Sequence, residues 1–401
     1  MKLLPPLGIL IISVSSIILL PNFFQNEKSV TNYVFEEVQE VIASTEKEVE
    51  KYVHVKVPTF FDSNGNPVER NIPPQKTPED VRGLYMTSWI ASRPDLRTRI
   101  IQQIEDTPNL NSIIIDIKDD TGKISFKSED PLLQEIGSTE NRISDIDILL
   151  TELNEKGIYI IGRIAVFQDP FLIHVWPEEA VKKSSESEDL WLDRKKIGWI
   201  DPGSKKTWDY VATLAEESYK RGFDEINFDY IRFPSDGNMR EIYYPLSSGK
   251  VKSEVMESFF QYIYERLEPQ NIVTSADIFG MTAVNTDDLG IGQILEKTVP
   301  YFDYISPMVY PSHFPSGWAG ISDPAGEPYA VIKKSMERAY ERVVAMGEDP
   351  KKLRPWLQDF NLGAVYTSEL VRAQIQALED IGIYSWLMWS PRNVYTMSAF
   401  N

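Results

Sequence analysis

The chain contains no cysteine and only three histidines among its 401 residues. The absence of cysteine excludes disulfide bonds, thiolate zinc sites and cysteine nucleophiles. The histidines, His54, His174 and His313, are far apart and form neither an HxxxH nor an HExxH pattern, so no histidine-based metal site is expected. Glycine-rich phosphate loops and the GxSxG nucleophile elbow are also missing, which excludes the common nucleotide-binding and serine-hydrolase signatures.

Positive charge is scarce as well. The chain has 41 lysines and arginines against 60 aspartates and glutamates, which gives a net charge of −19. A nucleic-acid-binding protein normally carries a basic face, so no nucleic-acid partner is expected. We predict no cofactor and no metal. One alternative is left open by the acidic residues, a carboxylate-bound Mg²⁺ or Ca²⁺ at Asp116, Asp119 and Asp120.

The N-terminal residues carry a targeting pattern. Lys2 precedes an apolar run at residues 7–20, which Pro21 ends. We predict that residues 1–22 are a signal peptide or a membrane anchor, which would place the protein outside the cell or anchored and facing outside. A buried helix of a soluble protein is the alternative. Residues 23–80 are polar and later rich in proline, and we interpret them as a linker.

From residue 81 onward, short apolar runs alternate with longer amphipathic segments. Eight runs are apolar: 83–89, 112–119, 158–167, 225–233, 272–280, 304–311, 353–360 and 383–391. Seven segments between them have helical character: 96–105, 145–156, 204–221, 254–267, 290–298, 329–345 and 367–380. This alternation predicts an α/β fold, a (β/α)8 TIM barrel over residues 81–401, with an open doubly wound sheet as the alternative.

The run at 225–233 holds the first candidate for chemistry. Asn227 and Asp229 lie on one face of an otherwise apolar strand, and Tyr230 and Arg232 follow directly. A buried carboxylate is costly in free energy unless a partner or a function compensates it. Because the C-terminal ends of parallel strands carry the active sites of such folds, Asp229 is the first catalytic candidate. Tyr230 and Arg232 are candidate substrate-binding residues.

Other polar side chains fall near the ends of the remaining predicted strands. They are Asp116, Lys118, Arg163, Asp277, Tyr310, His313, Gln358, Asp359 and Trp386. If the strands close into a barrel, most of these side chains converge on one mouth. That mouth would be acidic and aromatic, with tryptophans such as Trp356 and Trp389 in addition, and aromatic faces suit sugar rings.

Two carboxyl groups that flank a bond are what glycosidic cleavage needs. Asp229 would be the ionised nucleophile or base, because Arg163 on the neighbouring strand would keep it charged. Asp277, one strand further on, would donate the proton. Carboxyl groups on adjacent strands could lie about 5 Å apart, which favours the retaining geometry. The rival acids are Asp359, Asp116 and Asp120.

Five segments of the chain resemble the bacterial "putative glycosyl hydrolase" barrel family, which is distantly similar to the α-amylase superfamily. They are GLYMTSW at 83–89, IDIKDD at 115–120, GIYIIGR at 157–163, FDEINFDYIRFP at 223–234 and WLQDF at 356–360. The resemblance covers roughly residues 81–397. It implies a (β/α)8 fold, export and a sugar polymer as substrate.

The resemblance also implies roles for two carboxylates. An α-amylase-like enzyme has its nucleophilic aspartate at the end of strand four, which Asp229 matches. It usually has a glutamate as acid/base on strand five, where this chain has Asp277. The arginine two residues before the nucleophile is Asn227 here, and the paired histidine motifs are absent. These departures leave α-glucan specificity unassigned.

The sequence therefore predicts a glycoside hydrolase that acts on an extracellular or cell-envelope polysaccharide. Asp229 and Asp277 or Asp359 would be catalytic, Arg163 would give electrostatic support, and the sugar would contact residues that include Tyr310, Gln358 and Trp386. One alternative is a non-catalytic carbohydrate-binding barrel that acts as an envelope scaffold. Another is a metal-dependent phosphodiesterase or deacetylase, which the scarcity of histidine disfavours.

Overall fold

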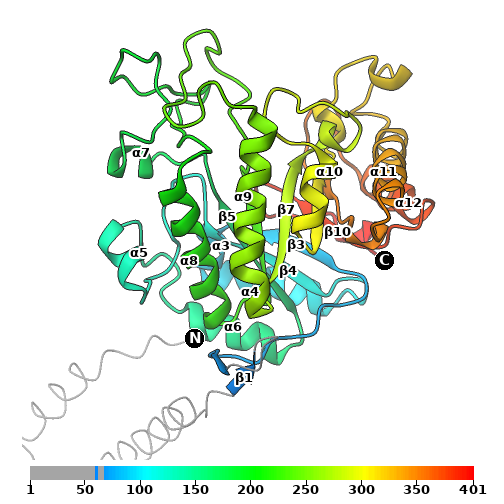
Figure 1. Ribbon diagram of the computed structural model, residues 1–401. Coiled ribbons are helices and arrows are strands. Elements are labelled where there is room, and N and C mark those ends of the chain that lie inside the picture. The colour runs from blue at the N-terminus through cyan, green and yellow to red at the C-terminus, as the bar shows by residue number, and fades with distance from the viewer. Residues whose placement is uncertain (1–58, 62–66) are drawn as a thin grey trace, which may run out of the picture. The chain divides into compact units, whose positions relative to one another are not determined.

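The computed structural model describes residues 59–61 and 67–401, and eight parallel strands in it form a closed barrel (Figure 1). The strands are β3 (Arg82–Met86), β4 (Ser112–Lys118), β5 (Tyr159–Ala165), β6 (Glu225–Asp229), β7 (Val273–Phe279), β8 (Tyr304–Met308), β9 (Trp356–Gln358) and β10 (Trp386–Trp389). Seven of them lie inside the predicted apolar runs, and β3 begins one residue earlier. The predicted barrel is confirmed and the open sheet is excluded, since β10 pairs with β3.

Helices follow the strands and surround the barrel (Figure 1). They are α3 (Ser88–Ala91), α4 (Pro94–Glu105), α5 (Pro131–Ile136), α6 (Ile146–Glu155), α7 (Leu172–Val175), α8 (Lys205–Arg221), α9 (Lys252–Leu267), α10 (Leu295–Thr298), α11 (Pro328–Ala345) and α12 (Ser368–Glu379). Short 3-10 turns lie at Glu268–Gln270, Gly280–Ala283, Val299–Tyr301, Pro311–His313, Trp318–Gly320, Pro350–Lys352 and Met397–Ala399.

One predicted helix is much shorter than expected. The segment 290–298 forms a helix only at α10, because Gly290 and Gly292 have φ values of 69° and 83°. These left-handed conformations belong to turns rather than to a right-handed helix. By contrast, α8 starts where predicted, since the Ser204 hydroxyl accepts a hydrogen bond from the backbone N–H of Thr207 at 3.0 Å.

The strands pack on both of their faces. Residues such as Leu84 and Ile113 belong to a large core between the strands and the helices, while Tyr85, Ile114 and Leu387 belong to a smaller core inside the barrel. Alternate residues of a strand point to opposite faces, so each strand feeds both cores. The barrel interior is therefore a filled core. Polar side chains are found in its layer at the C-terminal ends of the strands.

The segment before the barrel closes its N-terminal end. A hairpin of β1 (Thr59–Phe61) and β2 (Pro67–Glu69) leads to Arg70, which forms a fully buried ion pair with Asp224 at 3.0 Å. Gln75 donates a hydrogen bond to the carbonyl of Ile158 at 2.7 Å. These partners directly precede β6 and β5. Residues 70–75, which the sequence placed in the linker, therefore pack on the barrel through specific polar contacts.

The remaining N-terminal expectations lie outside the described residues. This holds for the signal or anchor at residues 1–22 and for most of the predicted linker. Within the described residues, no helix combines the length and the apolar character that a membrane crossing requires.

Candidate active site

A buried arginine connects the acidic residues at the C-terminal end of the barrel. Arg163 on β5 donates from Nη1 to Asp116 Oδ1 at 2.8 Å and from Nε to Asp229 Oδ2 at 3.1 Å. Its Nη2 also contacts Asp229, and Asp277 Oδ2 lies 3.9 Å from Nε. The register of the parallel strands produces this cluster, because Asp116 pairs with Arg163 and Arg163 pairs with Asn227.

Asp229 is held by donors only. Besides Arg163, the backbone N–H of Tyr230 donates to Asp229 Oδ1 at 2.6 Å. Tyr230 has a φ of 53°, a left-handed conformation that a tyrosine adopts at a cost of about 1 kcal/mol or more. These contacts fix the orientation of Asp229 and suit an anion.

Asp277 lies in a different environment. Its Oδ1 accepts hydrogen bonds from Asn227 Nδ2 at 2.9 Å and from Trp356 Nε1 at 2.7 Å. Burial, together with the negative charge of Asp229, raises the pKa of Asp277 well above its ordinary value. The raised pKa favours the protonated form of Asp277, and Oδ2 is the oxygen that accepts neither of these hydrogen bonds.

The two carboxyl groups are close together. Asp229 Oδ2 and Asp277 Oδ2 lie 3.1 and 3.9 Å from the same Arg163 Nε, so these oxygens are separated by at most about 7 Å. Carboxyl pairs of glycosidases have separations of about 5–9.5 Å, and the limit found here is compatible with that range.

Asp116 contacts the cluster from outside the cavity. It accepts hydrogen bonds from Tyr85 Oη at 2.6 Å and from Arg163, and burial raises its pKa to about 6. Asp116 does not line the cavity described next, so its contact with Arg163 is its link to the site.

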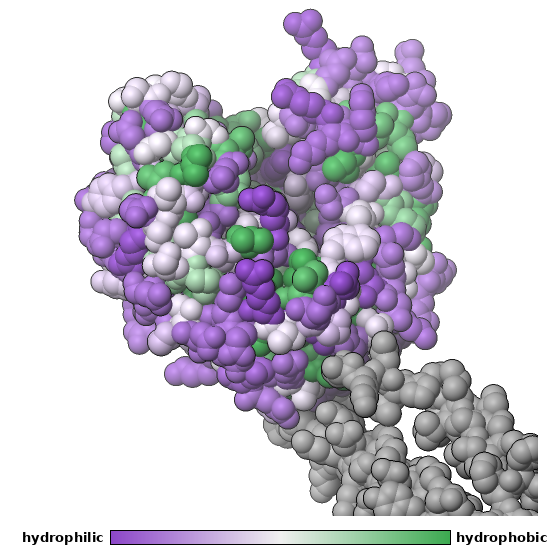
Figure 2. All heavy atoms as spheres, turned by 180° about the vertical axis from the view of Figure 1, so that it is seen from behind, coloured by the Kyte–Doolittle hydropathy of each residue, from purple (hydrophilic) through white to green (hydrophobic). Residues whose placement is uncertain are grey.

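A cavity of about 410 Å³ opens above the cluster, within the size range of small-molecule sites. Both Asp229 and Asp277 line it. The other lining residues are Arg163, Lys195, Tyr230, Arg232, Phe279, Gly280, Met281, Met308, Tyr310, His313, Phe314, Trp356, Phe360, Leu362, Trp389 and Pro391. On the face shown in Figure 2, hydrophilic residues predominate and the surface is hollowed at its upper edge.

Aromatic rings form much of the cavity wall. Trp389 stacks on Tyr85 with ring centroids 4.2 Å apart, and Trp356 meets Trp389 edge to face at 5.8 Å. Tyr310 lies edge to face with Phe360 at 5.8 Å. Such packed rings offer rigid apolar faces on which a sugar ring can stack.

The structure brings most of the predicted site residues together. Seven of them line the cavity: Asp229, Asp277, Arg163, Tyr230, Arg232, Tyr310 and His313. Five do not line it: Asp116, Lys118, Gln358, Asp359 and Trp386. Four of these five, Lys118, Gln358, Asp359 and Trp386, make contacts that indicate packing roles. The sequence had led us to expect substrate or catalytic contacts for them.

Lys118 and Trp386 are displaced for reasons of strand geometry. A register shift between β4 and β5 follows Asp116, and Lys118 pairs with Asp169 at 2.7 Å in the interior. Trp386 belongs to the outer core and stacks on Phe400. Residues 386 and 389 have opposite parity on β10, so Trp389 faces the cavity instead.

Gln358 and Asp359 bind neighbouring loops. The Ser312 hydroxyl donates to Gln358 Oε1 at 2.8 Å. Asp359 accepts from the backbone N–H of Thr396 at 2.7 Å and from its hydroxyl at 2.8 Å. These contacts attach the loop after β8 and the C-terminal segment to the end of β9.

Sequence reasoning did not single out Lys195, Phe279 and Phe360 as site residues. The one signal for Lys195 is the length of the segment between β5 and α8, residues 166–204, since long loops often carry function. No periodic pattern inside that loop indicates which of its residues reaches the cavity.

The open alternative of a metal at Asp116, Asp119 and Asp120 does not fit the contacts. Asp119 accepts hydrogen bonds from Ser88 at 3.0 Å and from the backbone of Thr121 at 3.1 Å, and it pairs with Arg142. Its oxygens are thereby engaged by protein donors. No group of three or more histidine or acidic residues in the described ranges has the arrangement of a metal site.

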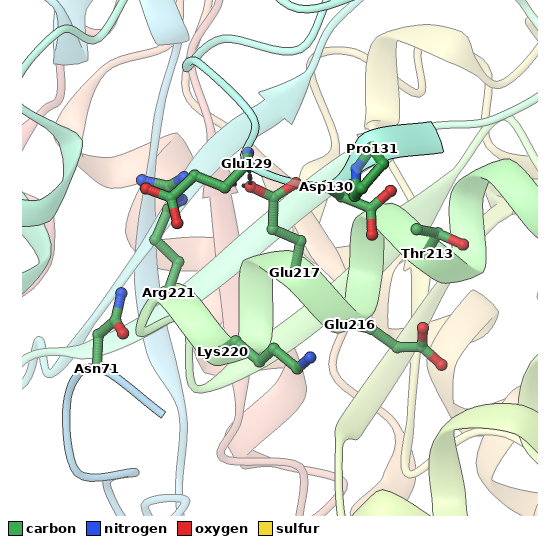
Figure 3. A pocket seen from close by; sticks show the side chains of 9 residues that line it. All are labelled: Asn71, Glu129, Asp130, Pro131, Thr213, Glu216, Glu217, Lys220 and Arg221. Atoms are coloured by element: carbon green, nitrogen blue, oxygen red, sulfur yellow. Dashed lines mark hydrogen bonds and ion pairs between the residues drawn. The ribbon is translucent and has the colours of Figure 1, made fainter. Parts of the chain in front are cut away.

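A second hollow, of about 320 Å³, lies away from the acidic cluster (Figure 3). Three of its four acidic residues are bound by protein donors, namely Asp130, Glu216 and Glu217. Glu217 accepts from the backbone N–H of Glu129 at 2.8 Å and pairs with Arg221 at 3.1 Å. This hollow lacks the pair of unlike carboxyl groups and the aromatic wall of the barrel mouth.

A family profile matches residues 83–395, most of the described barrel. The chain belongs to the family described as "Putative glycosyl hydrolase domain". The family assignment makes it a glycoside hydrolase and confirms the resemblance found in the sequence. The wider relation to the α-amylase superfamily is supported only in part, because the match specifies glycosyl hydrolases without that superfamily. No match is found among curated proteins.

Several solved structures are similar. The glycoside hydrolase domain of PgaB (BpsB) from Bordetella bronchiseptica is 13% identical over 78% of this chain and 95% of that one, with a TM-score of 0.55. The C-terminal domain of a putative chitinase from Desulfitobacterium hafniense DCB-2 is 9% identical over 80% and 96%, with a TM-score of 0.50. These two share the fold. A hypothetical protein from Ruminiclostridium thermocellum ATCC 27405 is 33% identical over 52% and 98%, with a TM-score of 0.44.

Proposed function

We propose that the chain hydrolyses the O-glycosidic bonds of a polysaccharide by a two-carboxylate mechanism, with Asp229 as nucleophile or base and Asp277 as acid. The observation that carries this proposal is the pair of unlike carboxyl groups in one cavity. Asp229 is bound by Arg163 and a backbone N–H, while burial next to Asp229 raises the pKa of Asp277. Glycosidases need this division of roles between an ionised and a protonated carboxyl group.

The reaction would proceed in balanced steps. Asp277 gives its proton to the glycosidic oxygen as the bond from that oxygen to the anomeric carbon breaks, and Asp229 attacks the anomeric carbon. Asp277, now ionised, takes a proton from the water that hydrolyses the glycosyl ester and restores both groups. Arg163 would stabilise the negative charge at each stage, and Trp389 would hold the sugar ring.

The limit of about 7 Å between the carboxyl oxygens favours the retaining course, in which these groups lie about 5–5.5 Å apart. Asp229 would then form a covalent glycosyl intermediate. Proton NMR of the first product anomer distinguishes retention from inversion, and release of the inverted anomer would assign Asp229 the role of base.

The proposal includes an extracellular or cell-envelope polysaccharide as substrate. The apolar run at residues 7–20 after Lys2 supports an exported or membrane-tethered protein. Fractionation of cells that express the full chain, followed by N-terminal sequencing of the product, tests export and cleavage separately.

Asp229→Asn is the decisive test of the mechanism. We expect turnover to fall by at least about 10³-fold, because the amide cannot attack or accept a proton, while the circular dichroism spectrum stays native. The assay is reducing-end release from a panel of bacterial and plant polysaccharides. Asp106→Asn is the matched control, since it makes the same change at an exposed aspartate that does not line the cavity.

The control should keep its activity. Undiminished turnover in Asp229→Asn would refute the catalytic assignment. A wild-type protein that binds glycans and releases no reducing ends would favour the scaffold alternative.

A further inference from the structure

Two cations on the cavity wall form no ion pair at contact distance with a carboxylate of the described residues. Arg232 follows β6, and Lys195 lies in the loop between β5 and α8. Arg163, the third cation of the cavity, is different because Asp116 and Asp229 neutralise it. The net positive charge of the wall therefore comes from Arg232 and Lys195.

Arg232 is unusual in a chain with a net charge of −19. Across residues 67–401, every other arginine either forms an ion pair with a carboxylate or is exposed to solvent. The exposed arginines without such a pair are Arg99, Arg194, Arg240 and Arg392. Arg232 alone is half-buried without a carboxylate partner in that part of the chain, a position that is costly in free energy without compensation.

The guanidinium of Arg232 is fixed by its surroundings. It lies 4.9 Å from the ring centroid of Trp199, 5.5 Å from that of Tyr230 and 5.7 Å from that of Phe279. Its Nη1 donates to the carbonyl of Phe233 at 3.0 Å and to the Ser235 hydroxyl at 3.2 Å. Among the described residues, Nε and Nη2 have no hydrogen-bond acceptor. Burial lowers the pKa of Arg232 by more than the nearby charges of Asp229, Asp236 and Asp193 raise it, so an added anion in direct contact would recover part of the lost solvation.

We propose that Arg232 and Lys195 form a subsite for an anionic substituent of the sugar chain, a carboxylate or a phosphate. This inference rests on the proposed hydrolase function and narrows its substrate class to acidic polysaccharides. The planar fork of an arginine binds either group with two parallel hydrogen bonds, and a lysine adds a mobile point charge. Since the protein as a whole repels polyanions, local cations at the cavity would set where an acidic glycan binds.

Binding is tested with the Asp229→Asn protein, which should not consume its ligand. The carboxylate probe is oligogalacturonate and the phosphate probe is phosphomannan; methyl-esterified oligogalacturonate and neutral mannan are their uncharged counterparts. Isothermal titration should show that at least one acidic probe binds about tenfold or more tightly than its neutral counterpart, with an affinity that falls as NaCl rises.

Variants assign this binding to the subsite. Arg232→Gln should weaken the binding of the acidic probe about tenfold or more. Arg232→Lys should recover only part of this loss in affinity, because it restores the charge without the planar guanidinium group. Lys195→Gln changes an exposed side chain, so it tests the subsite without risk to folding. Arg99→Gln is the matched control, since it removes one exposed and unpaired positive charge on α4.

The results separate the subsite from the hydrolase function. Equal binding of acidic and neutral probes, no binding of any acidic probe, or weakening by Arg99→Gln as large as that by Arg232→Gln would overturn the subsite. Hydrolysis of a neutral glycan by wild type, with KM unchanged in Arg232→Gln, would also overturn it and leave the hydrolase intact. Acidic probes that bind through Arg232 and are never hydrolysed would support the subsite and refute the hydrolase.

Discussion

The guanidinium of Arg163 lies next to three buried carboxyl groups. Arg163 contacts Asp116 and Asp229 and lies 3.9 Å from the nearest oxygen of Asp277. One positive charge cannot compensate three negative charges in a site from which water is largely excluded, so the cluster favours retention of a proton. Asp277, the most distant of the three from the cation, is the group whose pKa rises well above its ordinary value. Under the proposed mechanism, this charge balance separates the acid, Asp277, from the base, Asp229.

This separation predicts a bell-shaped dependence of kcat/KM on pH, with Asp277 on the basic limb. Trp356 donates to Asp277 Oδ1 and thereby stabilises its ionised form. Trp356→Phe should therefore raise the pKa of Asp277 and move the basic limb to higher pH. Trp386→Phe, on the outer face of β10, should leave the profile in place. A basic limb that stays fixed or moves to lower pH in Trp356→Phe would contradict the role given to Asp277.

The raised pKa of Asp277 also predicts a cost to stability. A carboxyl group with a folded pKa above its ordinary 3.8 stabilises the fold fully below that value, and this contribution is lost as pH rises through the folded pKa. Asp277→Asn should therefore abolish turnover and raise the melting temperature relative to wild type more at pH 7 than at pH 4. Thermal unfolding at the two pH values measures the difference. An equal shift at both would contradict the pKa argument.

At the scale of the element, the apolar runs predicted the strands well but the side-chain direction poorly. In β10 both faces are buried, so nothing in the run Trp-Leu-Met-Trp indicates which tryptophan points inward. Trp386 was chosen as a sugar contact, whereas Trp389 lines the cavity. The register shift after Asp116, which redirects Lys118, has no signal in the sequence either.

Charged residues inside the apolar runs indicated the location of the cavity better than the apolar residues indicated side-chain direction. Asp229, Asp277 and Arg163 were found from sequence because a charge in a buried strand needs a partner or a function. Lys195 and Phe360 reach the cavity from segments whose positions depend on tertiary packing. Such contacts cannot be obtained from local periodicity, which explains why the residues at the centre of the cavity could be named from the sequence and those at its rim could not.

The junction between β7 and β8 gives a prediction at the same scale. Gly280 follows β7 in the cavity wall, and a Cβ at this position would lie only 2.3 Å from the carbonyl oxygen of Met308. Gly280→Ala should push the two strand ends apart, destabilise the protein by about 1–3 kcal/mol and lower kcat/KM. Urea unfolding and steady-state kinetics test both effects. Unchanged stability and activity would show that the cavity wall can accommodate the added methyl group without a cost in free energy.

At the scale of the whole molecule, the ion pair between Arg70 and Asp224 connects the N-terminal segment to the barrel. Both side chains are fully buried, and Arg70 also donates to the carbonyl of Phe223 at 2.8 Å. Arg70→Ala leaves Asp224 buried and unpaired, which should lower the free energy of unfolding by about 3–5 kcal/mol. We expect kcat per folded molecule to stay the same, because the pair lies at the end of the barrel opposite the cavity.

Arg93→Ala is the control for this change, since its pair with Asp95 is exposed to solvent and should contribute less than about 1 kcal/mol. Denaturant unfolding of both variants gives the comparison. Similar losses of stability in the two variants, or a fall in kcat for Arg70→Ala, would contradict the view that Arg70 acts as a structural clamp remote from the chemistry.

The position of this clamp has a practical meaning for any use of the protein on a support. The chain enters the barrel at the N-terminal ends of the strands, where Arg70 and Gln75 bind residues that precede β6 and β5 (lower part of Figure 1). A bead, surface or fusion partner joined ahead of Arg70 would meet the rear of the barrel. The opposite end, with the cavity, would stay accessible to polymers too large to diffuse behind an immobilised enzyme.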